Sequence, residues 1–147
     1  MKATFLLRRE HVALIARCES LLEAGHAHVP LEVLRVDASE LRRALDEHMK
    51  VEEEVFYPAC ETVPELRDLV RQAREEHRSV RALLRELDGS TTALALLARV
   101  KLLAERFEEH VEDEEEDLFP RVRRVLGEAR MEQLGVDLVR RRALVPA

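Results

Sequence analysis

The chain contains one short pattern twice, and this pattern limits what the surrounding segments can form. Segments 48–58 and 110–120 each begin with His, carry Glu four residues later and end with Pro ten residues after the His. On a helix, residues four apart lie on the same face, one turn apart, so each copy brings an imidazole and a carboxylate together. Both groups are good ligands for first-row transition metals. The repeat therefore predicts two helices that each supply half of one metal site.

The composition favours an all-α protein. The 147 residues are 46% hydrophobic and 37% charged, with four Gly and no Trp, which is typical of one helical domain with its own core. The net charge of −6 argues against a nucleic-acid partner, because phosphate binding needs a basic surface. The start of the chain has too short an apolar run for a signal peptide, and no segment approaches the ~20 apolar residues of a membrane span. We therefore expect a cytoplasmic protein with no membrane partner.

Four long segments have helical periodicity, and short breaks separate them. The expected helices cover about 4–24, 31–57, 62–87 and 92–126, and a shorter amphipathic helix covers 128–144. Gly25 is expected to end the first helix, Pro58 to end or kink the second, Thr91 or Thr92 to cap the fourth, and Gly127 to separate the last two. Loops this short make consecutive helices antiparallel. The sequence predicts a single domain over 1–147, an up-down-up-down four-helix bundle (about 4–126) with a short extra C-terminal helix.

The predicted helices carry apolar stripes that polar side chains interrupt near the middle. The second stripe includes Val55 and continues to Ala59, and the fourth continues to Val125; these residues are expected to face the core. The Glu10-His11 pair recurs as Glu76-His77, so the two halves of the bundle are expected to be equivalent. The interrupting residues are His11 in the first stripe, His48 with Glu52 in the second, His77 in the third, and His110 with Glu114 in the fourth.

Burying this set without compensation would be costly. A desolvated, unpaired carboxylate costs several kcal/mol, so the core must neutralise its two carboxylates by protonation, by pairing with charged His, or by binding cations. One His in a stripe is usually a hydrogen-bonded core residue, but four His with two Glu favour a polynuclear metal site. Imidazole and carboxylate without thiolate suit iron, manganese or zinc. Glu53 and Glu115 lie about 140° around the helix from their His, as second-choice ligands or outer partners.

The remaining candidates are assigned ordinary roles. Cys18 and Cys60 have no metal-type spacing and are expected to be buried. His26 and His28 fall in the first loop and are expected to be exposed. The cluster Arg140-Arg141-Arg142 is interpreted as the basic end of the last helix, where cations complement the helix dipole.

The ligand spacing also points to a family. Ferritin-like di-iron proteins carry Glu three residues before His, and the corresponding positions here are Arg8, Leu45, Arg74 and Phe107. The order His, His-x-x-x-Glu, His, His-x-x-x-Glu instead resembles that of the hemerythrin-like (HHE cation-binding) family, and the resemblance covers nearly the whole chain, from His11 to Pro120. The resemblance implies an oxo- or hydroxo-bridged pair of iron ions. The residues implied are His11 and His48 on one ion, His77 and His110 on the other, and Glu52 and Glu114 as bridges.

The chain departs from the oxygen carriers of that family at one position. Those proteins have a fifth His four residues before the one matching His77, and this position is Ala73 here. Both ions would then be open to exogenous ligands. We expect a non-haem di-iron protein that binds or responds to O2, NO or peroxide, or handles iron, with no catalytic side chain beyond the ligands. The alternatives are a di-iron oxidoreductase that reduces peroxide or NO or repairs iron centres, and a metal-dependent sensor or interaction module with 128–144 as its lever.

Overall fold

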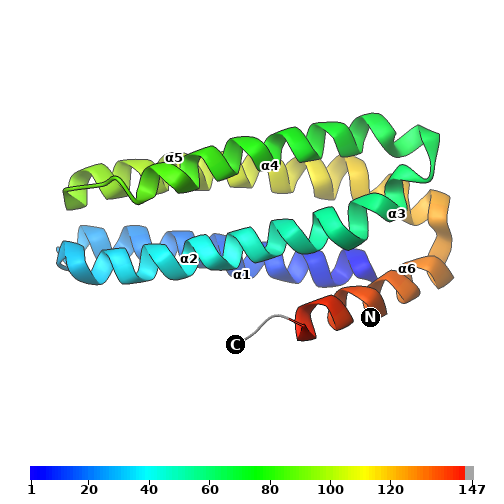
Figure 1. Ribbon diagram of the computed structural model, residues 1–147, viewed down its shortest axis with the longest axis horizontal. Helices are drawn as coiled ribbons and strands as arrows, with labels where there is room; N and C mark the ends of the chain where they lie inside the picture. The colour runs from blue at the N-terminus through cyan, green and yellow to red at the C-terminus, as the bar shows by residue number, and fades with distance from the viewer. Residues whose placement is uncertain (145–147) are drawn as a thin grey trace.

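The computed structural model describes residues 1–144, which form four long helical rods lying side by side (Figure 1). The first rod is α1 (Ala3–His26). The second consists of α2 (Leu31–Val51), a π-helical turn η1 (Glu52–Phe56) and α3 (Tyr57–Glu61). The third is the short 3-10 turn η2 (Pro64–Leu66) followed by α4 (Arg67–Leu87). The fourth consists of α5 (Ala93–Asp113), a second π-helical turn η3 (Glu114–Leu118) and the start of α6 (Phe119–Ala143).

Consecutive rods run antiparallel, so the predicted all-α, up-down-up-down four-helix bundle is confirmed (Figure 1). Within residues 1–144, no helix is both long and apolar enough to cross a membrane. The last three residues of the predicted domain, 145–147, lie outside the described part of the chain.

The first loop begins later than the sequence predicts. α1 continues through Gly25 to His26, and the left-handed residue of the turn is His28, with φ of 59°. Gly25 instead allows α1 to pack closely against Leu97 on α5, because a Cβ at this position would clash with Cδ2 of Leu97. The predicted exposure of His26 and His28 is confirmed. The predicted cap of the fourth rod is also correct, since Thr92 Oγ1 accepts a hydrogen bond from the Ala95 backbone N–H at 3.1 Å.

The two π-helical turns occupy the same place in both copies of the repeat. Each begins at the Glu that follows its His by four residues, and each repeat proline then falls in the first turn of the next α-helix, where a missing N–H is tolerated. Pro58 therefore does not end the second rod. A π turn contains more residues than an α turn, so the residues after it that face the core lie later in the sequence than an α-helical period predicts. Phe56 and Tyr57 are fully buried, whereas Val55, which was expected to face the core, is only half-buried.

The predicted C-terminal helix is the second part of α6. The helix bends at Gly127, where φ is 80° and ψ is 170°, and returns alongside α1 (Figure 1). Met131, Leu134 and Leu138, which share one predicted face, are buried against the bundle. The prediction for Val125 is wrong: it is 37% exposed, because it lies just before the bend, where α6 leaves the bundle.

The core consists of two apolar clusters. One lies at the end where α6 turns back, and the other lies at the end with the α1–α2 and α4–α5 loops. Cys18 and Cys60 are free thiols buried in these clusters, as predicted. Along each rod the two clusters are separated by one level that holds the buried His and Glu side chains.

Candidate metal centre

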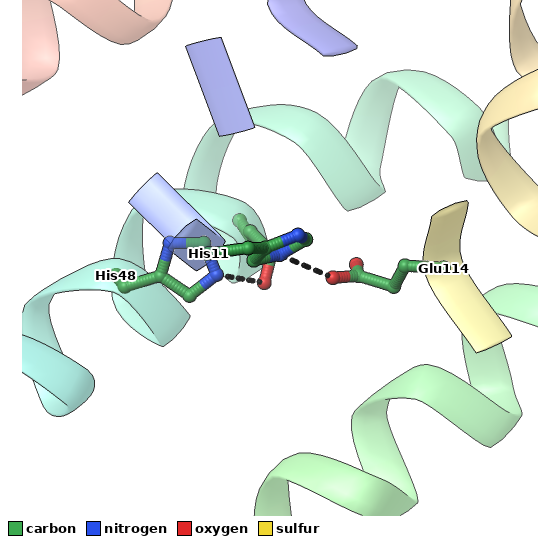
Figure 2. Close-up of side chains that lie close together, drawn as sticks. His11, His48 and Glu114 are labelled. Carbon is green, nitrogen blue, oxygen red and sulfur yellow. Dashed lines mark ion pairs between the residues drawn. The ribbon is translucent and has the colours of Figure 1, made fainter. Parts of the chain in front are cut away.

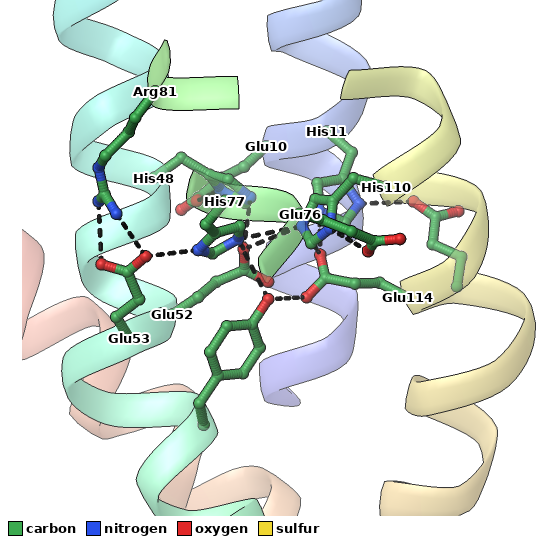
Figure 3. Close-up of polar contacts among 12 residues, drawn as sticks. Glu10, His11, His48, Glu52, Glu53, Glu76, His77, Arg81, His110 and Glu114 are labelled. Atoms are coloured by element: carbon green, nitrogen blue, oxygen red, sulfur yellow. Dashed lines mark hydrogen bonds and ion pairs between the residues drawn. The ribbon is translucent and has the colours of Figure 1, made fainter. Parts of the chain in front are cut away.

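The structure brings all six predicted site residues together in the middle of the bundle (Figures 2 and 3). Their side chains are at most 1% exposed, and each rod supplies at least one. The residues are His11 on α1, His48 on α2, Glu52 on η1, His77 on α4, His110 on α5 and Glu114 on η3.

The Glu52 carboxylate lies between imidazoles of three rods. Its Oε1 is 3.1 Å from Nε2 of His48 and 3.2 Å from Nε2 of His77. The same oxygen is 3.8 Å from Nε2 of His110. Glu52 therefore reaches His side chains of both halves of the repeat.

Glu114 occupies the corresponding position in the second copy. Its Oε1 is 3.1 Å from Nε2 of His11 on α1, a contact that Figure 2 shows, and 3.1 Å from Nε2 of His110. The six side chains fall into two groups able to hold a metal ion. One group is His11, His48, Glu52 and Glu114, and the other is Glu52, His77 and His110.

Each of the four imidazoles also contacts a second carboxylate through Nδ1, on the side away from the centre (Figure 3). In every case the carboxylate comes from the preceding rod, and the fourth rod returns to the first. The four contacts are Glu10 with His48 at 2.7 Å, Glu53 with His77 at 2.6 Å, Glu76 with His110 at 2.8 Å and Glu115 with His11 at 2.7 Å. We call this closed set the glutamate ring.

The glutamate ring orients the imidazoles. A carboxylate that accepts from Nδ1–H leaves the Nε2 lone pair free for a cation, and metal-binding His residues usually have such a partner. The structure thus places Glu53 and Glu115 as hydrogen-bond partners of His. Sequence reasoning assigned no role to Glu10 and Glu76, although the repeated Glu-His pair was a visible signal.

Three glutamates of the ring are paired with arginine. Arg81 contacts both oxygens of Glu53, at 2.7 and 2.9 Å (Figure 3). Arg142 Nη2 lies 2.6 Å from Glu10, and Arg8 Nε lies 3.4 Å from Glu115. Arg141 binds Glu47 and Glu54. The basic cluster near the end of α6 therefore does more than complement a helix dipole, because two of its arginines attach α6 to acidic residues of the bundle.

Protons in this metal-free cluster are held by imidazoles. Burial alone would lower the pKa of His48, but the Glu52 and Glu10 carboxylates raise it to about 9. Burial would also lower the pKa of His110. The carboxylates of Glu114, Glu52 and Glu76 outweigh this effect and raise the pKa well above its usual value. The pKa of Glu52 lies well below its usual value, because the charge on His48 and the surrounding hydrogen bonds outweigh the effect of burial.

Tyr57 makes the two halves of the centre different. Its hydroxyl donates to Glu114 Oε2 at 2.7 Å and lies 3.1 Å from Nε2 of His77. Burial and the nearby Glu114 charge raise the pKa of this phenol well above its usual value, so it stays protonated. The equivalent residue in the second copy is Phe119, whose ring stacks on His11 with centroids 5.9 Å apart. Sequence reasoning gave Tyr57 no role.

Several polar atoms of the centre have no hydrogen-bond partner. They are Nε2 of His11 and of His48, both carboxylate oxygens of Glu52, and Oε1 of Glu114. Buried polar atoms are normally satisfied, and leaving them unpaired is costly. A cation that accepts lone pairs from nitrogen and oxygen would satisfy all of them at once. The donor set therefore fits bound metal.

Buried imidazoles from all four rods, together with buried carboxylates from two of them, form a helical bundle whose centre could hold a cation. The family comparison names the class more closely: the model of the hemerythrin HHE cation-binding domain matches residues 2–122. The chain belongs to this family, as its ligand spacing predicted. No curated protein and no solved structure matches the chain.

Proposed function

We propose that the protein holds two iron ions at the middle of the bundle. His11 and His48 bind one ion, His77 and His110 bind the other, and Glu52 and Glu114 bridge the two. One observation carries this proposal: each buried carboxylate lies within 3.8 Å of Nε2 atoms from both His pairs. Manganese and zinc suit the same donors and remain the alternatives.

The bound ions would serve a small ligand such as O2, NO or peroxide. Iron supplies redox chemistry and open coordination positions when it is bound. The protein supplies the orientation of the imidazoles through the glutamate ring and keeps bulk water out with an apolar cluster on either side of the centre. Ala73 lies where oxygen carriers of this family have a fifth His, so no third imidazole restricts access to either ion.

Metal content and ligand response test this proposal together. Protein from its native host is analysed for metal, and metal-free protein is loaded anaerobically with Fe2+ and then exposed to O2 or NO. We expect two iron ions per chain and a change in the visible spectrum with either gas. The variant His77→Ala should lose metal, whereas His26→Ala, at the exposed end of α1, should keep it. Zinc in the native protein would overturn the iron assignment, and an unchanged spectrum with both gases would overturn ligand binding.

One observation favours a second candidate, a metal-dependent sensor. Arg142 on α6 contacts Glu10, and Glu10 accepts from His48, so the end of α6 is two contacts away from the centre. A change of charge at His48 would reach α6 through Glu10. Limited proteolysis of metal-free and iron-loaded protein tests this role. Equal protection of 128–144 in both forms would reject it.

A further inference from the structure

Each Glu–His contact of the glutamate ring forms one corner, and the corner at Glu76 differs from the other three. Glu10, Glu53 and Glu115 each lie within 4.0 Å of an arginine nitrogen. Among residues 1–144, no arginine or lysine nitrogen comes that close to Glu76. Its outer oxygen instead lies 3.4 Å from the Gln72 amide nitrogen, which is also 3.2 Å from Asp113. Two carboxylates thus share one neutral donor where the other corners have a cation.

The same corner contains a narrow hollow whose lining includes Glu114 of the centre. Residues of α4, α5 and η3 line it: Leu69, Gln72, Ala73, Glu76, Asp113, Glu114, Asp117 and Leu118. Asp117 is exposed at the outside, and Glu114 is 1% exposed. Ala73 contributes only a methyl group to the lining of the hollow.

Glu114 supplies the independent sign of a ligand. It belongs both to the lining of the hollow and to the centre, and its buried Oε1 accepts no hydrogen bond. The same oxygen lies 3.1 Å from Nε2 of His11 and of His110, so a cation that reaches Glu114 from the hollow comes next to two imidazoles of the centre. The acidic side chains that line the hollow therefore range from exposed, at Asp117, through half-buried, at Asp113, to buried, at Glu114.

We propose that this hollow is the path by which divalent metal ions reach the centre. Asp117 and Asp113 attract a hydrated divalent cation and hold it briefly, Gln72 and Glu76 replace part of its water shell, and Glu114 delivers it to the imidazoles. Carboxylates attract cations and repel anions, so the path selects charge before any ligand is bound. The proposal rests on the proposed function in one respect, namely that the centre holds metal.

Uptake kinetics with Co2+ test the path, since the visible absorption of Co2+ changes when nitrogen ligands replace water. The test variant is Asp113→Asn/Asp117→Asn. The matched control is Glu112→Gln/Glu116→Gln, which removes the same charge from the same acidic run but at exposed positions that do not line the hollow. At low ionic strength we expect uptake by the test variant to be on the order of fivefold to tenfold slower, with unchanged final stoichiometry. The control should stay within about twofold of wild type, and salt should reduce the difference.

Two further measurements keep the outcome clear. The single change Asp117→Asn is at an exposed position that folding does not need, so it should still slow uptake if the double variant misfolds. Ala73→Val narrows the hollow without changing charge and should also slow uptake. Equal slowing of test and control variants, or no slowing in either, would overturn the path. A wild-type protein that takes up no metal at equilibrium would instead refute the proposed function.

Discussion

Metal binding to this protein should release protons, and the number follows from the centre. At pH 7.5 the His48 imidazole, with a pKa of about 9, is protonated in the metal-free protein. The pKa of His110 is also well above its usual value. Each imidazole must lose a proton before Nε2 can bind metal. We therefore expect about two protons to be released per chain, one for each ion, so the apparent affinity for each ion should rise about tenfold per pH unit between pH 7 and pH 8.

Isothermal titration calorimetry measures this number directly. Metal-free protein is titrated with Zn2+ at one pH in several buffers that differ in ionisation enthalpy. The observed binding enthalpy is plotted against the ionisation enthalpy of the buffer, and the slope of this plot gives the number of protons released. Glu10→Gln is the control variant, because it removes one of the two carboxylates that raise the pKa of His48. Its slope should be smaller at pH 8.5. A slope near zero for the wild type at pH 7.5 would show that the imidazoles are already neutral and would refute the reasoning.

Two further predictions concern the stability of the metal-free protein. Tyr57→Phe leaves the buried Glu114 Oε2 without its donor, so it should lower the free energy of unfolding by about 1–3 kcal/mol in urea titrations, and by less after metal loading; equal losses with and without metal would contradict this. The pKa of Glu53 is lowered to about 2, because hydrogen bonds from His77 and Arg81 outweigh the effect of burial. Its contribution of at most about 3 kcal/mol is therefore present above pH 4.5 and is lost as the pH falls toward 2, so urea midpoints of wild type and Glu53→Gln should converge in acid.

Much of the centre could be predicted because the spacing of its residues along a helix already places them on one face. The four-residue interval of His48 and Glu52 places two side chains on one face whatever the rest of the chain does. The single His residues were found because a polar group in an apolar stripe is costly. Both signals survive small errors in helix boundaries.

The rest depends on how the helices meet. Val55 packs against the core but is only half-buried, because a helical period cannot anticipate the π turns that begin at Glu52 and Glu114. Gly25 was misread because its neighbour Leu97 is remote in sequence. Glu10 directly precedes an inward-facing residue, whereas Glu53 directly follows an inward-facing residue. Because their rods are antiparallel, both glutamates nevertheless lie on the side of their rod that faces the next rod around the bundle. This relation becomes visible only once the rods are known to be adjacent.

The glutamate ring also bears on the order of folding and metal binding. Each rod gives one carboxylate and receives one, so a rod that slid by one turn, about 5.4 Å, would break two of the four contacts at once. None of these contacts involves a metal. The ring therefore holds the four His residues at one height before any ion arrives. Small zinc domains fold only as they bind metal, whereas we expect these metal-independent contacts to keep the bundle assembled while ions enter and leave the centre.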